Sequence, residues 1–269
     1  MGLLFDHNTN KKGSGKMKKI AIVTGASSGL GKDFVRQLDR KYELDEIWMI
    51  ARRKEKMKKL AHSLKNSKGV VIGADLSRRE EINKVINKLN DEKPRVLFLV
   101  NSAGFGKIGS FIELGLDEQL DMIDLNIKAL TAMTYNVLPY MSKGSKIIQI
   151  ASSAAFLPQP GFNIYSATKA YVFHFSKALG IELKNKGIGV LAVCPGPVKT
   201  EFFKVASSKG KPLDWKSKFM VQSKDVVAQA LKDSEQNKME SVYGVTMKLF
   251  KIVSRIIPHR MILKMFKWN

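Results

Sequence analysis

A tyrosine and a lysine spaced four residues apart are the first candidates for acid–base chemistry. Tyr165 and Lys169 lie in a segment of helical periodicity, so they share one helix face and the ammonium group can approach the phenol. A nearby cation stabilises the phenolate. We therefore expect it to lower the pKa of Tyr165 and to make the phenol a usable proton donor or acceptor. The pair alone is not specific, because both residue types are common in cores and on surfaces.

Ser152 is a candidate for contact with the same substrate. It follows an apolar run at 147–150 that predicts a buried strand, so it lies at the carboxyl end of that strand. Open α/β sheets bind their ligands at this end, and a hydroxyl group there can hydrogen-bond a carbonyl on which charge develops. We therefore predict that Ser152 hydrogen-bonds a substrate carbonyl, and that Tyr165 is available as a proton donor or acceptor.

A glycine-rich turn near the N-terminus indicates a bound cofactor. The turn joins a predicted strand to a predicted helix and contains Gly25, Gly29 and Gly31. Glycines let the backbone approach a pyrophosphate closely, and the helix N-terminus offers N–H donors. The spacing is not G-x-G-x-x-G, and a plain strand-to-helix turn is the alternative. The position at the first crossover nevertheless favours a dinucleotide.

Two arginines after the second predicted strand bear on which dinucleotide binds. An acid at that strand end would accept hydrogen bonds from a free ribose 2′-hydroxyl, but the chain has Ala51, Arg52 and Arg53 there. Guanidinium groups suit a phosphate, so we predict NADP(H) rather than NAD; a solvated charge cluster is the alternative. Asp75, after the third strand, either meets the adenine or helps to start the next helix.

The elements that must position these residues alternate between strand and helix. Six short apolar runs predict strands, and longer segments between them show helical periodicity. The strands are expected at 18–24, 47–51, 70–74, 96–100, 147–150 and 190–193, and the helices at 32–38, 55–64, 80–89, 117–141 and 164–183. Because strand–helix–strand crossovers are right-handed, we predict a single-domain α/β fold, a Rossmann-type doubly wound parallel sheet with helices on both faces.

Further polar residues follow the predicted strands in a fixed order. The segment 101–104 ends the fourth strand, Asn126 lies in the next helix, and the segment 195–200 follows the sixth strand. Each alone could be turn chemistry or a local cap. Taken together with the glycine turn and the tyrosine–lysine pair, the order from about Lys18 to Thr200 resembles the classical short-chain dehydrogenase/reductase family. One departure is Ser102, where asparagine is commoner in the family.

The resemblance implies an oxidoreductase with a tetrad of Asn126, Ser152, Tyr165 and Lys169. In that pattern Tyr165 transfers the proton, Ser152 polarises the carbonyl, and Lys169 tunes the tyrosine and grips the nicotinamide ribose. Asn126 supports a water-linked proton relay, and Arg52 occupies the position where NADP-using members carry a basic residue. The cofactor-binding residues are then expected to be Gly25, Ser27, Ser28, Gly29, Leu30, Gly31, Arg52, Arg53, Asp75, Leu76, Asn101, Ala103, Gly104, Tyr165, Lys169, Pro195, Gly196, Val198 and Thr200.

Apolar residues around the predicted site indicate a bulky hydrophobic ketone or secondary alcohol. In the family, specificity resides largely after Thr200, where we predict a lid at about 198–222. A hydroxysteroid is the first choice of substrate and a long-chain ketoacyl compound the second; packing of the lid against its own domain is the alternative. The expected substrate contacts are Ser152, Phe105, Phe156, Tyr165, Phe202 and Trp215.

Composition bounds the remaining possibilities. Of 269 residues, 44% are hydrophobic and 26% charged, which is typical of a globular protein. The single cysteine, Cys194, excludes an intramolecular disulfide and a cysteine-based zinc site, and we predict no metal site. No apolar run reaches the length of a membrane-spanning helix, and the Lys-rich N-terminal segment does not resemble a signal peptide. We expect a cytoplasmic protein with a polar extension at 1–17, a catalytic domain at 18–240 and a tail at 241–269.

The net charge of +22 requires an anionic partner or surface to be considered. The tail at 241–269 combines basic and large apolar residues without acids, so it could lie on an anionic membrane, cover the pocket or form an oligomer interface. The family resemblance implies a homodimer or homotetramer. Alternatives to the enzyme are a basic protein that binds nucleic acid or membrane on the same scaffold, and an NADP-sensing regulator. No nucleic-acid motif accompanies the charge, so nucleic-acid binding is not expected.

Overall fold

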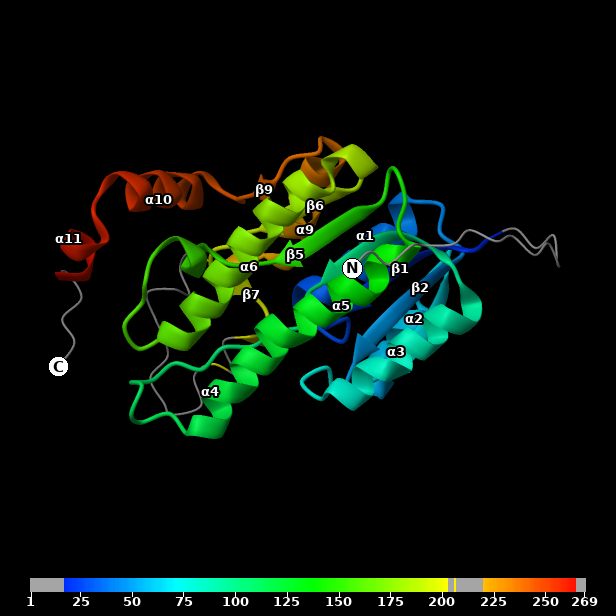
Figure 1. The fold of residues 1–269 in the computed structure, drawn as a ribbon, viewed down its shortest axis with the longest axis horizontal. Helices are drawn as coiled ribbons and strands as arrows, with labels where there is room; N and C mark the ends of the chain where they lie inside the picture. The colour runs from blue at the N-terminus through cyan, green and yellow to red at the C-terminus, as the bar shows by residue number, and fades with distance from the viewer. Residues whose placement is uncertain (1–16, 203–205, 207–219, 265–269) are drawn as a thin grey trace, which may run out of the picture.

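A seven-stranded parallel sheet forms the centre of the molecule in the computed structural model, which describes residues 17–202, 206 and 220–264 (Figure 1). The strand order is β3-β2-β1-β4-β5-β6-β9, and every neighbouring pair is parallel. The strands are β1 (Lys19–Thr24), β2 (Glu46–Ala51), β3 (Lys68–Gly73), β4 (Arg95–Asn101), β5 (Lys146–Ile150), β6 (Gly189–Val193) and β9 (Glu240–Ser241). The six predicted strands and the doubly wound fold are confirmed, whereas the two-residue β9 has no apolar run to predict it.

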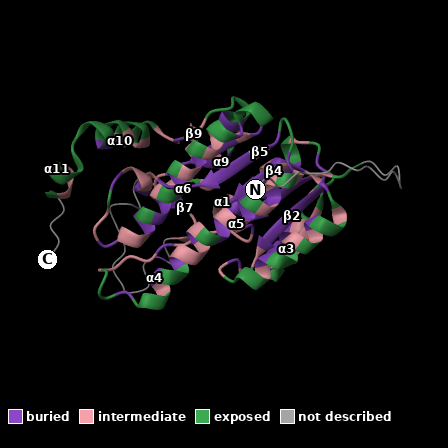
Figure 2. Cartoon of the chain, in the orientation of Figure 1, coloured by how far each residue is buried: buried purple, intermediate pink, exposed green. Residues whose placement is uncertain are grey.

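Helices cover both faces of this sheet. Helices α1 (Gly29–Lys41), α2 (Lys54–His62) and α9 (Ser223–Glu235) cover one face, and α3 (Arg79–Glu92), α5 (Leu130–Val137) and α6 (Asn163–Glu182) cover the other. The strands are apolar on both sides because both faces are covered. Figure 2 shows them buried between helices that expose their outer sides.

The helix predicted at 117–141 changes its type along its length. It consists of α4 (Leu116–Ile123), a π-helical turn η1 (Asp124–Ala129), α5 and a 3₁₀ turn η2 (Leu138–Tyr140). A π-turn holds an extra residue, is rare and is frequent at functional sites. Here it contains Asn126, whose side chain is buried.

The C-terminal part extends beyond the sheet layers. Two short strands, β7 (Val198–Lys199) and β8 (Val221–Gln222), pair in parallel, and the predicted lid between them lies largely outside the described residues. Helices α10 (Val245–Ile256) and α11 (His259–Lys264) lie at one end of the molecule (Figure 1). The remaining short turns are η3 (Ser153–Phe156) and η4 (Lys184–Lys186). Among the described helices, none is long and apolar enough to cross a bilayer.

Candidate active site

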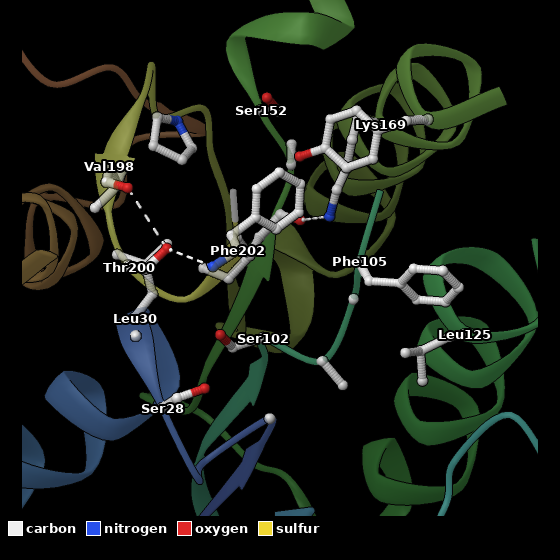
Figure 3. Close-up of a pocket in the computed structure, with 18 of the residues that line it drawn as sticks. Ser28, Leu30, Ser102, Phe105, Leu125, Ser152, Lys169, Val198, Thr200 and Phe202 are labelled. Carbon is white, nitrogen blue, oxygen red and sulfur yellow. Dashed lines mark hydrogen bonds between the residues drawn. The ribbon is translucent and has the colours of Figure 1, made fainter. Parts of the chain in front are cut away.

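The carboxyl ends of the strands open into a cleft of about 610 Å³. It spans the point between β1 and β4 where the strand order reverses, which is the usual ligand position in open α/β sheets. In Figure 3, Ser152 and Lys169 lie at one end of the cleft and Ser28 and Leu30 at the other. All predicted cofactor-binding residues except Gly31 and Asn101 line it.

The glycine turn between β1 and α1 has room for backbone only. A Cβ on Gly31 would lie 2.4 Å from the Gly25 carbonyl oxygen, and one on Gly25 would lie 2.8 Å from the Ala103 amide nitrogen. Gly25 and Gly29 also have φ angles of 66° and 53°, which disfavour other residues. The side chain of Ser28, the N-cap of α1, makes no capping bond, so N–H groups of the first turn are available to an anion.

A cluster of cations lies beside this turn. Arg53 donates through Nη2 to Ser28 Oγ at 2.7 Å and to Ser27 Oγ at 3.0 Å, and its Nη1 pairs with Glu201 Oε2 at 2.6 Å. Lys56 Nζ lies 2.7 Å from the second oxygen of Glu201. Hydrogen bonds from Lys56 and Arg53 lower the pKa of Glu201 to about 2. The cluster holds a carboxylate and has the charge and donors to hold a phosphate. Sequence reasoning missed Glu201.

The other predicted adenosine contacts lie nearby. Arg52 is exposed, with Nη1 3.8 Å from Asp75 Oδ2. Asp75 Oδ1 accepts hydrogen bonds from the Ser77 N–H at 3.2 Å and the Ser77 hydroxyl at 2.8 Å. Asp75 thus organises the turn before α3 while it, with Leu76, also lines the cleft.

Asn101 departs from the prediction of a cofactor contact. It is the last residue of β4, and its side chain is buried towards α5, where Nδ2 donates to Thr134 Oγ1 at 3.0 Å. The next two residues, Ser102 and Ala103, line the cleft instead. Thr24 Oγ1 accepts a hydrogen bond from each of their N–H groups at 3.0 Å, which ties this turn to β1.

Tyr165, Ser152 and Lys169 come together on the wall of the cleft. Tyr165 and Lys169 lie one turn apart on α6, and Ser152 follows β5. The Ser152 side chain lies near enough to the Tyr165 hydroxyl to act on its pKa. Lys169 Nζ donates to the Ile150 carbonyl at 2.7 Å and lies 5.7 Å from the centre of the Tyr165 ring. The predicted proximity of phenol, hydroxyl and ammonium is therefore present.

The predicted pKa of the tyrosine is wrong in direction. Burial raises the pKa of Tyr165 to about 12, against the opposing influence of the Ser152 side chain. Burial also lowers the pKa of Lys169 to about 8. The Lys169 ammonium is directed at the Ile150 carbonyl, so desolvation prevails over charge stabilisation of the phenolate. At neutral pH Tyr165 is protonated, which suits donation of a proton to a carbonyl.

Asn126 lies behind the cleft and joins two of its walls. Its Oδ1 accepts from the Phe105 N–H at 3.1 Å, and its Nδ2 donates to the Phe105 carbonyl at 2.9 Å and to Thr168 Oγ1 at 3.1 Å. A Cβ on Gly104 would lie 2.8 Å from Asn126 Oδ1 and 3.4 Å from Lys169 Nζ. These contacts position the loop after β4 against α6; the water-linked relay stays a prediction.

Aromatic rings form the other side of the cleft. The ring of Phe162 stacks on Tyr165 at 4.2 Å between centroids, and that of Phe202 lies 5.4 Å from Tyr165. Phe105 lines the cleft as predicted, and Trp215 lies outside the described residues. Phe156 does not line the cleft, because its ring packs edge-on against Phe173 at 5.6 Å.

The C-terminal tail supplies two residues that sequence reasoning missed. Met247 and Phe250 of α10 line the cleft, and a Cβ on Gly196 would lie 2.5 Å from Met247 Sδ. Of the three uses left open for the tail, covering the pocket is therefore observed. The three-residue spacing of Met247 and Phe250 was visible as one helix face, but nothing in the sequence showed what that face meets.

Comparison with known proteins agrees with this arrangement. The short chain dehydrogenase family matches residues 19–211. A very-long-chain 3-oxoacyl-CoA reductase of Anas platyrhynchos is 37% identical over 195 residues, which cover 69% of this chain but only 62% of that protein. A short-chain dehydrogenase from Sphingobium yanoikuyae in complex with NADPH is 25% identical, with a TM-score of 0.75 over 93% of this chain and 97% of that one. A serine dehydrogenase complexed with NADP+ is 29% identical, with a TM-score of 0.72 over 82% and 93%.

Proposed function

The chain belongs to the short-chain dehydrogenase family, and on this basis we propose that it uses NADP(H) to interconvert a secondary alcohol and a ketone on a bulky hydrophobic substrate. The observation that carries the proposal is that Tyr165, Ser152 and Lys169 line the same cleft as the glycine turn. A proton donor and a dinucleotide cradle that share one cleft provide for both halves of a carbonyl reduction.

The residues present fit a phosphorylated dinucleotide. The backbone at Gly25 and Gly31 is too closely packed for a side chain, and the first turn of α1 offers N–H groups to a pyrophosphate. Arg53, flanked by Ser27 and Ser28, would hold the 2′-phosphate. The NADPH and NADP+ named for the two structural relatives support this choice. When bound, the nicotinamide supplies or accepts the hydride.

The chain's own residues would manage the proton and the orientation of the substrate. In reduction, the protonated Tyr165 hydroxyl donates its proton to the substrate oxygen as that oxygen gains negative charge. In oxidation, the Tyr165 oxygen accepts the proton from the substrate alcohol. Ser152, which lines the cleft beside Tyr165, would orient the substrate oxygen. Lys169 lies beneath the ring and is held by Ile150, and Asn126 fixes the neighbouring loop.

The wall opposite the glycine turn supports a hydrophobic substrate. Phe105, Phe162, Phe202, Met247 and Phe250 all line the same cleft as Tyr165. The name of the Anas platyrhynchos relative, a 3-oxoacyl-CoA reductase, favours a long 3-oxoacyl chain over the hydroxysteroid that the sequence first suggested. Both are compounds with a ketone or secondary alcohol on a large apolar body, so a direct comparison of rates separates them.

The test is a turnover assay with purified full-length protein. NADPH and NADH are supplied separately with ketosteroids, long-chain 3-oxoacyl thioesters and long-chain ketones, and the absorbance of the reduced cofactor is followed in both directions. We expect NADPH-dependent reduction of at least one hydrophobic ketone. NADPH binding without turnover of any compound in either direction would overturn the proposal of an enzyme. It would favour the alternative of an NADP-sensing regulator.

Arginine variants test the choice of cofactor within the same assay. Arg53→Ala is expected to lower the preference for NADPH over NADH by about tenfold or more, because it removes charged hydrogen bonds to the phosphate. Arg52→Ala, at a more exposed position, is expected to do less. Lys58→Ala is the matched control, since Lys58 pairs with Glu55 at 2.8 Å on the surface of α2. An unchanged preference in Arg53→Ala would exclude Arg53 as the phosphate ligand.

We also propose that the protein forms homo-oligomers through α4 and α5. Leu116 and Leu120 lie one turn apart on α4 and are exposed, as is Tyr135 on α5. Exposed apolar residues on adjacent helices are typical of a subunit interface. Light scattering after gel filtration is expected to show a dimer or tetramer that Leu116→Asp and Leu120→Asp weaken; a monomer at all concentrations would refute this.

A further inference from the structure

We propose that the outer face of α10, formed by Val245, Leu249, Ile252 and Ile256, lies on an anionic lipid surface. This interaction goes beyond the proposed reaction, and it concerns the side of α10 that points away from the cleft. It would hold the protein at the surface of a membrane without crossing it.

The opposite side of α10 fixes the orientation of the helix. Met247 packs on Gly196 and lines the cleft together with Phe250. Ser254 is buried, and Lys251 forms an ion pair with Glu240 of β9. Because these side chains anchor one face of the helix, the opposite face is held outward.

The outer face is a continuous apolar stripe. Its four residues follow at intervals of four, three and four positions, the spacing that aligns side chains along an α-helix. Val245 is 83% exposed and Ile256 is 74% exposed, and the other two are more than half exposed. Figure 2 shows α10 coloured mainly as exposed, in contrast to the helices that cover the sheet.

The positive charge of the residues around the stripe favours an anionic partner. Lys248 and Arg255, seven residues apart, lie along one flank of the stripe, and Arg260 and Lys264 follow on α11. All four are exposed, and none pairs with an acid among the described residues. The chain contains no Asp or Glu after residue 241. An apolar stripe flanked by cations matches acyl chains beneath anionic headgroups.

A second copy of the chain fits this face less well. In a twofold interface the same patch meets itself, so the unpaired cations beside the stripe would face each other. Like charges brought together in this way oppose association. An anionic lipid surface instead offers opposite charge to the cations and an apolar layer to the stripe.

The dimensions of α10 limit the contact to the surface. Its 12 residues extend about 18 Å, well short of a bilayer core. The helix would lie flat, with Ile257 and Met261 continuing the exposed apolar surface beyond it. Since Met247 and Phe250 line the cleft from the same helix, the membrane would lie next to the substrate wall. That last consequence rests on the proposed substrate class, whereas the lipid contact does not.

The test is flotation of the full-length protein with vesicles. Vesicles of phosphatidylcholine alone are compared with vesicles that also contain phosphatidylglycerol, at low and high salt. We expect flotation with the anionic vesicles only, and less of it at high salt, because surface charge attraction is screened. Equal flotation with both kinds of vesicle, or none with either, would overturn the proposal.

Two double variants separate the stripe from the charges. Leu249→Gln with Ile252→Gln, and Lys248→Glu with Arg255→Glu, are each expected to weaken binding to anionic vesicles at least tenfold. Ile181→Gln is the matched control, because Ile181 is 63% exposed on α6, and it is expected to bind like the wild type. Wild-type binding by both double variants would assign the lipid contact to another basic surface.

Further readouts distinguish the remaining outcomes. Thermal unfolding and NADPH binding of each variant are expected to equal those of the wild type, so loss of flotation with both retained supports the proposal. A dimer that forms without vesicles and is lost in the Leu249→Gln, Ile252→Gln variant would assign the stripe to a second copy instead. Because flotation needs no turnover, it is independent of the outcome of the oxidoreductase assay.

Discussion

The cofactor side and the substrate side of the cleft are built from different kinds of contact. On the cofactor side, backbone lies against backbone: Gly31 has no room for a Cβ, and Thr24 bonds two N–H groups of the turn after β4. On the substrate side, aromatic rings meet, as the ring of Phe162 stacks on that of Tyr165. The first side is fixed by main-chain geometry and the second by side-chain volume.

The two sides also differ in where their residues come from. The cofactor side uses segments that follow the strands β1, β2, β3, β4 and β6. The substrate side collects Phe105, Phe162, Phe202 and Phe250 from separate loops and a terminal helix. Substitutions on the cofactor side should therefore act through the backbone, and substitutions on the substrate side through affinity for the substrate.

The largest effect is expected at Tyr165, which lies between the two sides, where a substitution should lower kcat and leave cofactor affinity unchanged. Tyr165→Phe removes the hydroxyl that we propose transfers the proton, so kcat should fall about 10²–10⁴-fold. NADPH affinity, measured by fluorescence titration, should stay within a factor of two or so of the wild type. A kcat within tenfold of the wild type would show that another group transfers the proton.

A single methyl group tests the backbone packing on the cofactor side. In Gly31→Ala the new Cβ would lie 2.4 Å from the Gly25 carbonyl oxygen, so the turn must shift. We expect a loss of about 1–3 kcal/mol of stability and at least a roughly tenfold loss of NADPH affinity. Gly115→Ala is the control, because a Cβ there meets nothing within 4 Å. Equal melting temperatures and affinities for the two variants would refute the close packing.

Removal of a ring tests the substrate side. Phe250→Ala enlarges the cleft without touching Tyr165 or the glycine turn, so the KM of a bulky substrate should rise about tenfold. The kcat and the KM for NADPH should change little. A small ketone assayed with the same variant is the internal control, and a parallel rise in its KM would indicate a general disturbance of the site.

A weaker effect is expected where the two sides meet at Glu201. The carboxylate occupies the Arg53 guanidinium, 2.6 Å away, which the 2′-phosphate would need. Glu201→Gln should therefore improve NADPH affinity about two- to fivefold, a range typical of exposed ion pairs, and leave NADH affinity unchanged. Weaker NADPH binding would mean that Glu201 positions Arg53 for the phosphate.

The smallest expected effect is on the pH dependence of stability. Burial lowers the pKa of Lys169 from 10.5 to about 8, so between these values the unfolded chain binds more protons and stability rises with pH. Burial raises the pKa of Cys194 from 9.0 to about 12, so that group lowers stability as pH rises through this range. Subtracting the melting temperature of Lys169→Met from that of the wild type removes most of the Cys194 contribution. This difference should increase by a few degrees from pH 7.5 to pH 9.5, within the range expected for a domain of this size. A constant difference would refute the shifted lysine.

The fold was predictable from the sequence where an apolar run is followed by turn-forming residues. β1 to β6 are apolar because both faces of the sheet are covered, and each is followed by turn residues. β9 was missed because Glu240 and Ser241 carry no apolar pattern, and their place in the sheet depends on tertiary contacts. The π-turn around Asn126 was missed because a helical pattern of side chains does not reveal one inserted residue.

The residues of the cofactor side were predictable from the sequence, whereas the rest of the site was predictable only in part. The glycines, Tyr165, Ser152 and Lys169 have residue types and spacings that carry their chemistry. The pKa of Tyr165 depends on burial and on the direction of the Lys169 ammonium, neither of which a spacing contains. Glu201 and Phe250 were missed because their partners lie far away in the chain.

The position of α10 has an evolutionary consequence. The family match ends at residue 211, whereas Met247 and Phe250 come from a helix that follows the last strand of the sheet. A segment that follows the last strand of the sheet can be exchanged without breaking any crossover of the sheet. Under the proposed function, substrate preference can therefore diverge by replacement of one helix, while Tyr165, Ser152 and Lys169 on the other side of the cleft stay the same.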